Sequence, residues 1–155
     1  MPTSRRDLDI WSLVQTERAV LAADLAQLTD QQWATPSLCS GLTVRQVLAH
    51  LTASASLGPV RWLAGVIHCR FEFDKMVAMR LAEQLGATPT ETLARFRSVV
   101  TSAVKAPVPT AAILGEAIVH AEDIRRPLAM TGRASYCDEL EGDGAAALRA
   151  RCTTP

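Results

Sequence analysis

The sequence lacks the features that would place it in a membrane, in a disulfide-bonded scaffold or in a zinc ribbon. No apolar run approaches the roughly 18 residues that a membrane-spanning helix needs. The first residues are polar and lead into an amphipathic helix, so we expect no signal peptide. The four cysteines form no Cys-x-x-Cys pair and no disulfide framework. We therefore expect a reduced, cytoplasmic setting.

An excess of charge of either sign is also missing. Lys and Arg number 16, Asp and Glu number 16, and the formal net charge is zero. Such a balance gives no electrostatic basis for binding nucleic acid or an anionic membrane, so we expect neither as a partner. The chain also has no Gly-x-Ser-x-Gly, P-loop or dinucleotide fingerprint, which removes the usual hydrolase and nucleotide-binding interpretations.

Helical periodicity runs through most of the chain, and no stretch alternates in the manner of a half-buried strand. Apolar residues recur at spacings of three and four in five segments, which are 8–28, 43–57, 71–85, 88–105 and 110–127. In the third segment we expect Phe73, Met76, Val77 and Leu81 to face inward. Four or five helices joined by short loops predict an all-α fold, a helical bundle.

Local signals predict where these helices begin and end. Thr43 is a good N-cap, and Thr88 to Glu91 has the form of a capping box with proline at the first helical position. Gly58 and Pro59 interrupt the second helix, so the apolar residues 60–69 either continue it or form a separate helical turn. We assign residues 8–129 to the bundle and residues 130–155, rich in glycine and acidic residues, to a poorly ordered tail.

Three polar side chains are candidates for sharing one metal ion. Glu116 and His120 lie four apart on the last helix and share a face, while His50 lies on the second helix. Two imidazoles and a carboxylate form the ligand set of a catalytic zinc and also of non-haem iron(II). Asp123, one turn further on, is placed to orient an imidazole. The alternative stays open that these groups are hydrogen-bonded core residues, since such spacings are common by chance.

The remaining candidates favour structural interpretations. We expect His68 to be a helix-end histidine, and Cys39 to be a packed thiol because no base is identifiable near it. Arg125 and Arg126 suit the C-terminal end of a helix, and a role in holding an anionic cofactor is the alternative. The three tryptophans are expected in the core or in a pocket wall; they are Trp11, Trp33 and Trp62.

Several segments, taken together and in order, resemble one known family. They are LTDQQW (28–33), PSLC (36–39), TVRQVLAHL (43–51), FEFD (71–74) and GEAIVHAEDIRRPL (115–128), with Trp11 and the pair Glu17-Arg18 before them. The chain resembles the N-terminal domain of the mycothiol-dependent maleylpyruvate isomerase family, within the DinB-like superfamily of metal-binding bundles. The resemblance implies a DinB-like four-helix bundle with short extra helices. It also implies that His50, Glu116 and His120 bind the metal, with zinc expected.

The resemblance further implies a mycothiol-dependent isomerase or S-transferase acting on a small electrophilic substrate. The metal would hold the thiol of the cofactor as a thiolate, which is its nucleophilic form. Arg125 or Arg126 would contact carboxylates of the cofactor or substrate. The alternative is a non-catalytic metal-binding or ligand-binding bundle, a remnant of a larger enzyme. A homodimer is open in either case.

Overall fold

The computed structural model describes residues 5–130, and within them the secondary structure is helical apart from one isolated antiparallel bridge between Pro36 and Thr43. The predicted tail from residue 131 onward lies outside the described residues. An all-α fold is thereby confirmed. The helices are α1 (Arg5–Asp24), α2 (Asp30–Trp33), α3 (Val44–Ser56), α4 (Pro59–His68), α5 (Phe73–Gln84), α6 (Pro89–Ser98) and α7 (Thr110–Arg125), with 3₁₀ turns at Leu25–Gln27 and Arg126–Leu128.

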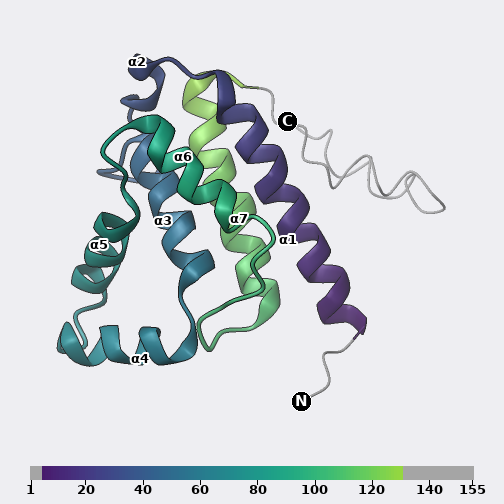
Figure 1. Ribbon diagram of the computed structural model, residues 1–155, viewed down its shortest axis with the longest axis vertical. Coiled ribbons are helices and arrows are strands. Elements are labelled where there is room, and N and C mark those ends of the chain that lie inside the picture. The colour runs from purple at the N-terminus through teal and green to yellow at the C-terminus, as the bar shows by residue number, and fades with distance from the viewer. Residues whose placement is uncertain (1–4, 131–155) are drawn as a thin grey trace, which may run out of the picture.

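Helices α1, α3, α6 and α7 enclose the core. Helix α7 lies between α1 and α3, α6 packs against both α3 and α1, and α5 packs against another side of α3 (Figure 1). Burial of these apolar faces is the main favourable contribution to folding. The core residues come from α1, α2, α3, α6 and α7 and from the 3₁₀ turn after α1, and they include Leu21, Leu25, Trp33, Val47, Leu48, Leu93, Phe96, Ala121 and Ile124.

A capping box starts α3, and a proline at its first position starts α4. The Thr43 hydroxyl accepts a hydrogen bond from the Gln46 backbone N–H, and the Gln46 side chain accepts one from the Thr43 N–H at 2.8 Å, which is a complete capping box. Pro59 then starts α4 at its first position, where a missing N–H costs nothing. The interruption predicted at Gly58-Pro59 is thus a helix boundary, and α4 crosses one end of the bundle (Figure 1).

Two details of α5 and α6 differ from the sequence-based expectation. Phe73 and Val77 were expected to face inward, but they are 54% and 38% exposed, because α5 covers α3 with a narrow stripe centred on Met76 and Leu81. Helix α6 ends at Ser98 and not near residue 105, since the β-branched residues that follow favour helix weakly. The described part contains seven α-helices, whereas four or five were predicted. The number is higher because α2 and α4 are separate short helices.

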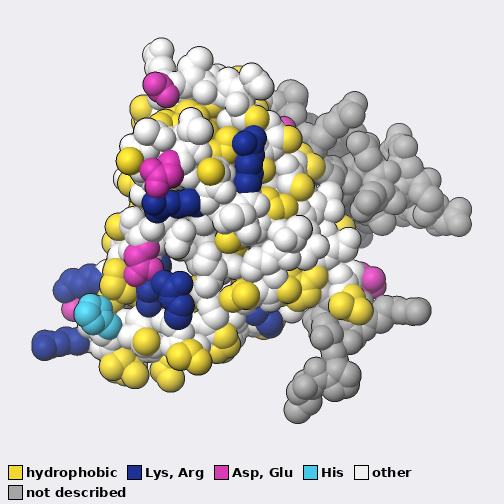
Figure 2. All heavy atoms as spheres, in the orientation of Figure 1, with side chains coloured by type: hydrophobic (Ala, Val, Ile, Leu, Met, Phe, Trp, Pro, Cys, Tyr) yellow, Lys and Arg dark blue, Asp and Glu magenta, His cyan; other side chains and the backbone are white. Residues whose placement is uncertain are grey.

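The outer face of α4 carries apolar side chains that no other described element covers. Val60, Leu63 and Ile67 are 82%, 53% and 61% exposed. Figure 2 shows apolar side chains gathered along the edge of the molecule where Figure 1 places α4. Among residues 5–130, no helix combines the length and the hydropathy that crossing a bilayer demands.

Candidate metal centre

Packing of α3 against α7 brings His50, Glu116 and His120 together. The distance from His50 Nε2 to Glu116 Oε1 is 3.4 Å. The rings of His50 and His120 meet edge to face, with centroids 5.0 Å apart and planes at 87°. One ligand atom from each of the three residues lies within 4.8 Å of the other two. Glu116 and His120, which follow His50 by 66 and 70 positions in the chain, thus come close enough to it for one ion to be shared.

A hydrogen bond to Asp123 fixes the orientation of the His120 ring. Its Nδ1 lies 3.0 Å from Asp123 Oδ2, one turn further along α7. A carboxylate in this position holds the proton on Nδ1 and leaves Nε2 with its lone pair free for a ligand. Asp123 therefore occupies the orienting position that its spacing from His120 predicted.

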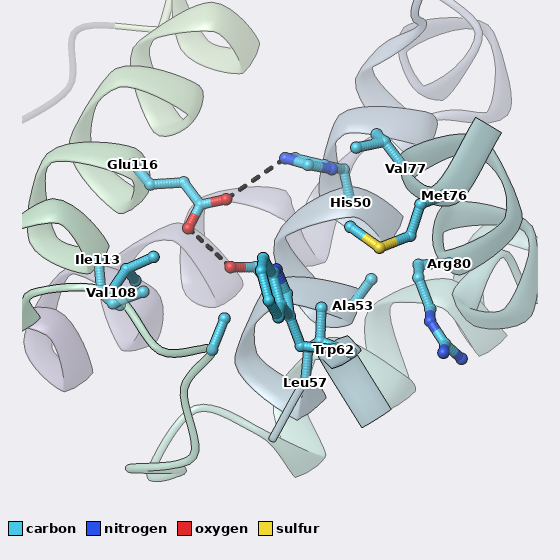
Figure 3. Close-up of a pocket in the computed structure, with 12 residues that line it drawn as sticks. His50, Ala53, Leu57, Trp62, Met76, Val77, Arg80, Val108, Ile113 and Glu116 are labelled. Atoms are coloured by element: carbon cyan, nitrogen blue, oxygen red, sulfur yellow. Dashed lines mark hydrogen bonds and ion pairs between the residues drawn. The ribbon is translucent and has the colours of Figure 1, made fainter. Parts of the chain in front are cut away.

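Ser54 is a member of the site that the sequence analysis missed. Its hydroxyl donates a hydrogen bond of 2.6 Å to Glu116 Oε2, so the Glu116 carboxylate is held between Ser54 on one oxygen and His50 on the other. Figure 3 shows the contact between Glu116 and His50. The signal was present, since Ser54 follows His50 by four residues and shares its face of α3.

Glu116 is held in its ionised form by its neighbours. Burial alone raises the pKa of this carboxyl, but hydrogen bonds from His50 and Ser54 and the electrostatic effect of both nearby imidazoles outweigh it, so the pKa lies below its ordinary value. On α1, the Arg18 guanidinium is 4% exposed and donates to the Ser102 carbonyl at 2.9 Å. Burial lowers the pKa of Arg18, and the nearby charge of Glu116 opposes that shift.

Cys39, His120 and Asp123 form a second group of ligand atoms within 4.8 Å of one another, and this group shares His120 with the first. The loop that carries Cys39 is fastened to α7 by a 3.1 Å hydrogen bond from the Leu38 N–H to the Asp123 carbonyl. Burial, followed by the negative charge of Asp123, raises the pKa of the Cys39 thiol. The sequence analysis treated this thiol as packed and did not place it beside His120.

A cavity of about 200 Å³ opens beside His50 and Glu116. Its walls come from α3, α4, α5, the segment before α7 and α7 itself, and Figure 3 shows Trp62 and Met76 among them. Most of the wall is apolar, and its polar members are Glu116, His50, Ser54 and Arg80. The apolar lining comprises Ala53, Leu57, Trp62, Met76, Val77, Ala106, Val108 and Ile113.

The two arginines proposed for cofactor binding lie away from this cavity. Arg125 is 1% exposed and pairs with Glu17 and Asp24 of α1 at 2.6 and 2.8 Å. Arg126 has an exposed side chain that contacts Glu122 at 3.1 Å. Neither lines the cavity, so their role towards a cofactor stays a prediction. His68 lies in the last turn of α4, as expected.

The three converging residues fit a divalent cation. Ligand atoms about 2.0 Å from a tetrahedral zinc lie about 3.3 Å apart, which is close to the 3.4 Å between His50 Nε2 and Glu116 Oε1. The set of two imidazoles and one carboxylate leaves a position open for a further ligand. A cation at this point borders the cavity, because His50 and Glu116 belong to the cavity wall.

Comparison with known proteins assigns the chain to a family. The family described as mycothiol maleylpyruvate isomerase N-terminal domain matches residues 14–112, which include α3 and His50 but end before Glu116 and His120. Searches among curated proteins and among solved structures found no match. The match covers more than half of the chain, from within α1 to the start of α7. The chain therefore belongs to the mycothiol maleylpyruvate isomerase N-terminal domain family.

Proposed function

We propose that the protein is a metal-dependent enzyme that uses mycothiol, as an isomerase or an S-transferase, on a small electrophile. The observation that carries the proposal is the convergence of His50, Glu116 and His120 at the edge of an apolar cavity. Zinc is the proposed metal because of this ligand set. Membership of a mycothiol-linked family supports the proposed cofactor.

The residues around the site prepare it for thiol chemistry. A divalent cation bound here would lower the pKa of a thiol ligand and keep it as the nucleophilic thiolate. Asp123 fixes the His120 ring, and Ser54 fixes the Glu116 carboxylate, so neither side chain has to reorient when a ligand arrives. An electrophile lying against the apolar part of the wall would displace water from that space, which would strengthen electrostatic interactions at the site.

Titration of mycothiol into the zinc-loaded protein, followed by calorimetry, tests this proposal. We expect saturable binding to the wild type and loss of binding in His120→Ala, because that variant removes one cation ligand. His68→Ala is the matched control, since it removes an exposed imidazole at the end of α4 and leaves the site intact. If the zinc-loaded wild type does not bind mycothiol, the proposal is wrong.

A metal-stabilised bundle without catalysis is the second candidate. Both Glu116 oxygens already have protein partners, Ser54 and His50, so the carboxylate is satisfied as a structural group would be. This candidate function predicts that the protein binds zinc but does not bind mycothiol. The same titration therefore separates the two functions.

A cytoplasmic setting belongs to the proposal, because a thiol cofactor acts as a nucleophile only while it remains reduced. A homodimer is a further proposal. Sedimentation equilibrium of the full chain measures it directly.

A further inference from the structure

We propose that Cys39, His120 and Asp123 form a second cation site, which takes a thiophilic cation such as Cd²⁺. One ligand atom from each of these residues lies within 4.8 Å of the other two. The site is distinct from the zinc site of the proposed function, because its sulfur ligand comes from the loop between α2 and α3. It shares only His120 with that site and takes part in no step of the proposed reaction.

The loop that carries Cys39 is fastened to α7. The Leu38 N–H donates a hydrogen bond of 3.1 Å to the Asp123 carbonyl. The Ser37 hydroxyl donates to the Leu42 carbonyl at 2.8 Å, which closes the loop on itself. Cys39 is partly buried and packs against the core. Its thiol is therefore kept near α7 by contacts that do not use the sulfur.

The spacing of the nitrogen and oxygen ligands suits a metal ion. His120 Nδ1 lies 3.0 Å from Asp123 Oδ2, and two ligand atoms about 2.0 Å from a tetrahedral zinc ion are about 3.3 Å apart. The cation would take the place of the proton that these two atoms share. The side chains of His120 and Asp123 are each 20% exposed, so an ion can reach them from solvent.

The ligand set explains the preference for a soft cation. A thiolate and a carboxylate carry two negative charges, which balance a divalent cation in a partly buried position. The first group has one carboxylate, Glu116, and no sulfur. Thiolate ligands select soft metal ions, whereas imidazole and carboxylate suit harder ones. Cadmium should therefore prefer the second group.

Binding of the cation moves the protons of two residues. The Cys39 thiol loses its proton to solvent and binds as the thiolate. The proton of His120 Nδ1 moves through solvent to Nε2, so the ring stays neutral. Nε2 is the nitrogen that the first group would use, and one His120 ring therefore serves one site at a time. A thiophilic cation at Cys39 would thus withdraw His120 from the first group.

Cadmium titration of the full chain, with Cys69, Cys137 and Cys152 replaced by serine, tests this proposal. The ultraviolet charge-transfer band of a thiolate–cadmium bond should appear and saturate, and His50→Ala in the same background should keep it. Asp123→Asn should weaken binding at least about tenfold, since the loss of even an outer-shell partner costs that much. The matched control keeps Cys69 as its only thiol. It should also bind at least about tenfold more weakly, because Cys69 belongs to no ligand group within residues 5–130.

NMR of the wild-type chain gives a readout that needs no variant to fold. With nitrogen-labelled histidine and an NMR-active cadmium isotope at one equivalent, coupling should appear at Nδ1 of His120 and not at His50. Coupling at His50 and at Nε2 of His120 alone would assign the cation to the first group and overturn the proposal.

Two results of the titration would also overturn it. They are equal affinity of the chains that keep only Cys39 or only Cys69, and an unchanged affinity in Asp123→Asn, since either would make Cys39 a lone thiol. None of these measurements uses mycothiol, so their failure leaves the titration of the proposed function unaffected.

Discussion

At the scale of single residues, His120 is shared by the two groups of possible metal ligands. Its ring lies between two groups of possible ligands, one with His50 and Glu116 and the other with Cys39 and Asp123. The hydrogen bond between Nδ1 and Asp123 occupies one nitrogen and one carboxylate oxygen of the second group. The first group adds a second imidazole and a carboxylate to His120, which is the ligand set typical of a catalytic zinc, and we therefore expect the cation there.

Metal content of two variants tests this division. We expect His50→Ala to lose bound zinc after dialysis and Cys39→Ser to keep the wild-type content, as measured by elemental analysis. Cobalt-loaded wild type and Cys39→Ser should give the same absorption spectrum, because no Cys39 sulfur binds the ion. Cys69→Ser is the control for a cysteine remote from His120. Loss of metal from Cys39→Ser, with retention in His50→Ala, would assign the cation to the second group.

At the scale of secondary structure, α7 is fastened to α1 by Arg125. This guanidinium is buried and contacts Glu17 and Asp24, which are spaced by seven residues along α1. Arg125 and Arg126 are adjacent and chemically identical, so the sequence alone could not distinguish a buried residue from an exposed one. The angle at which α7 meets α1 decides this, and that angle depends on packing between segments about 100 residues apart.

Replacing Arg125 by methionine should destabilise the fold by about 3 to 5 kcal/mol, because Glu17 is left buried without its partner. Arg126→Met, its neighbour, should change the free energy of unfolding by about 0.5 kcal/mol or less, since its ion pair is exposed. Urea denaturation of both variants measures the difference. Adding Glu17→Gln to Arg125→Met should recover part of the loss; no recovery would mean that the pair is not the cause.

At the scale of the whole molecule, the predictable features were those that depend on local sequence. The Thr43 cap, the boundary at Pro59 and the shared face of Glu116 and His120 follow from spacing and residue type alone. The meeting of His50 with Glu116 was one of two open interpretations until a family resemblance favoured it, because its geometry depends on how α3 packs against α7. The burial of Arg18 and the composition of the cavity wall depend on the positions of all neighbouring helices. No local sequence pattern could therefore predict them.

A cation at this site would bind residues of both α3 and α7, so its binding should stabilise the whole bundle. Because the unfolded chain does not hold these ligands together, zinc at 100 times its dissociation constant should add about 2.7 kcal/mol of stability. For a chain of this size that corresponds to a rise of about 5–10 °C in Tm. Calorimetric melting with zinc and with a chelator measures the shift. Glu116→Gln should abolish the shift and His68→Ala should retain it. Equal melting of the wild type in zinc and in chelator would show that the three side chains meet for a structural reason alone.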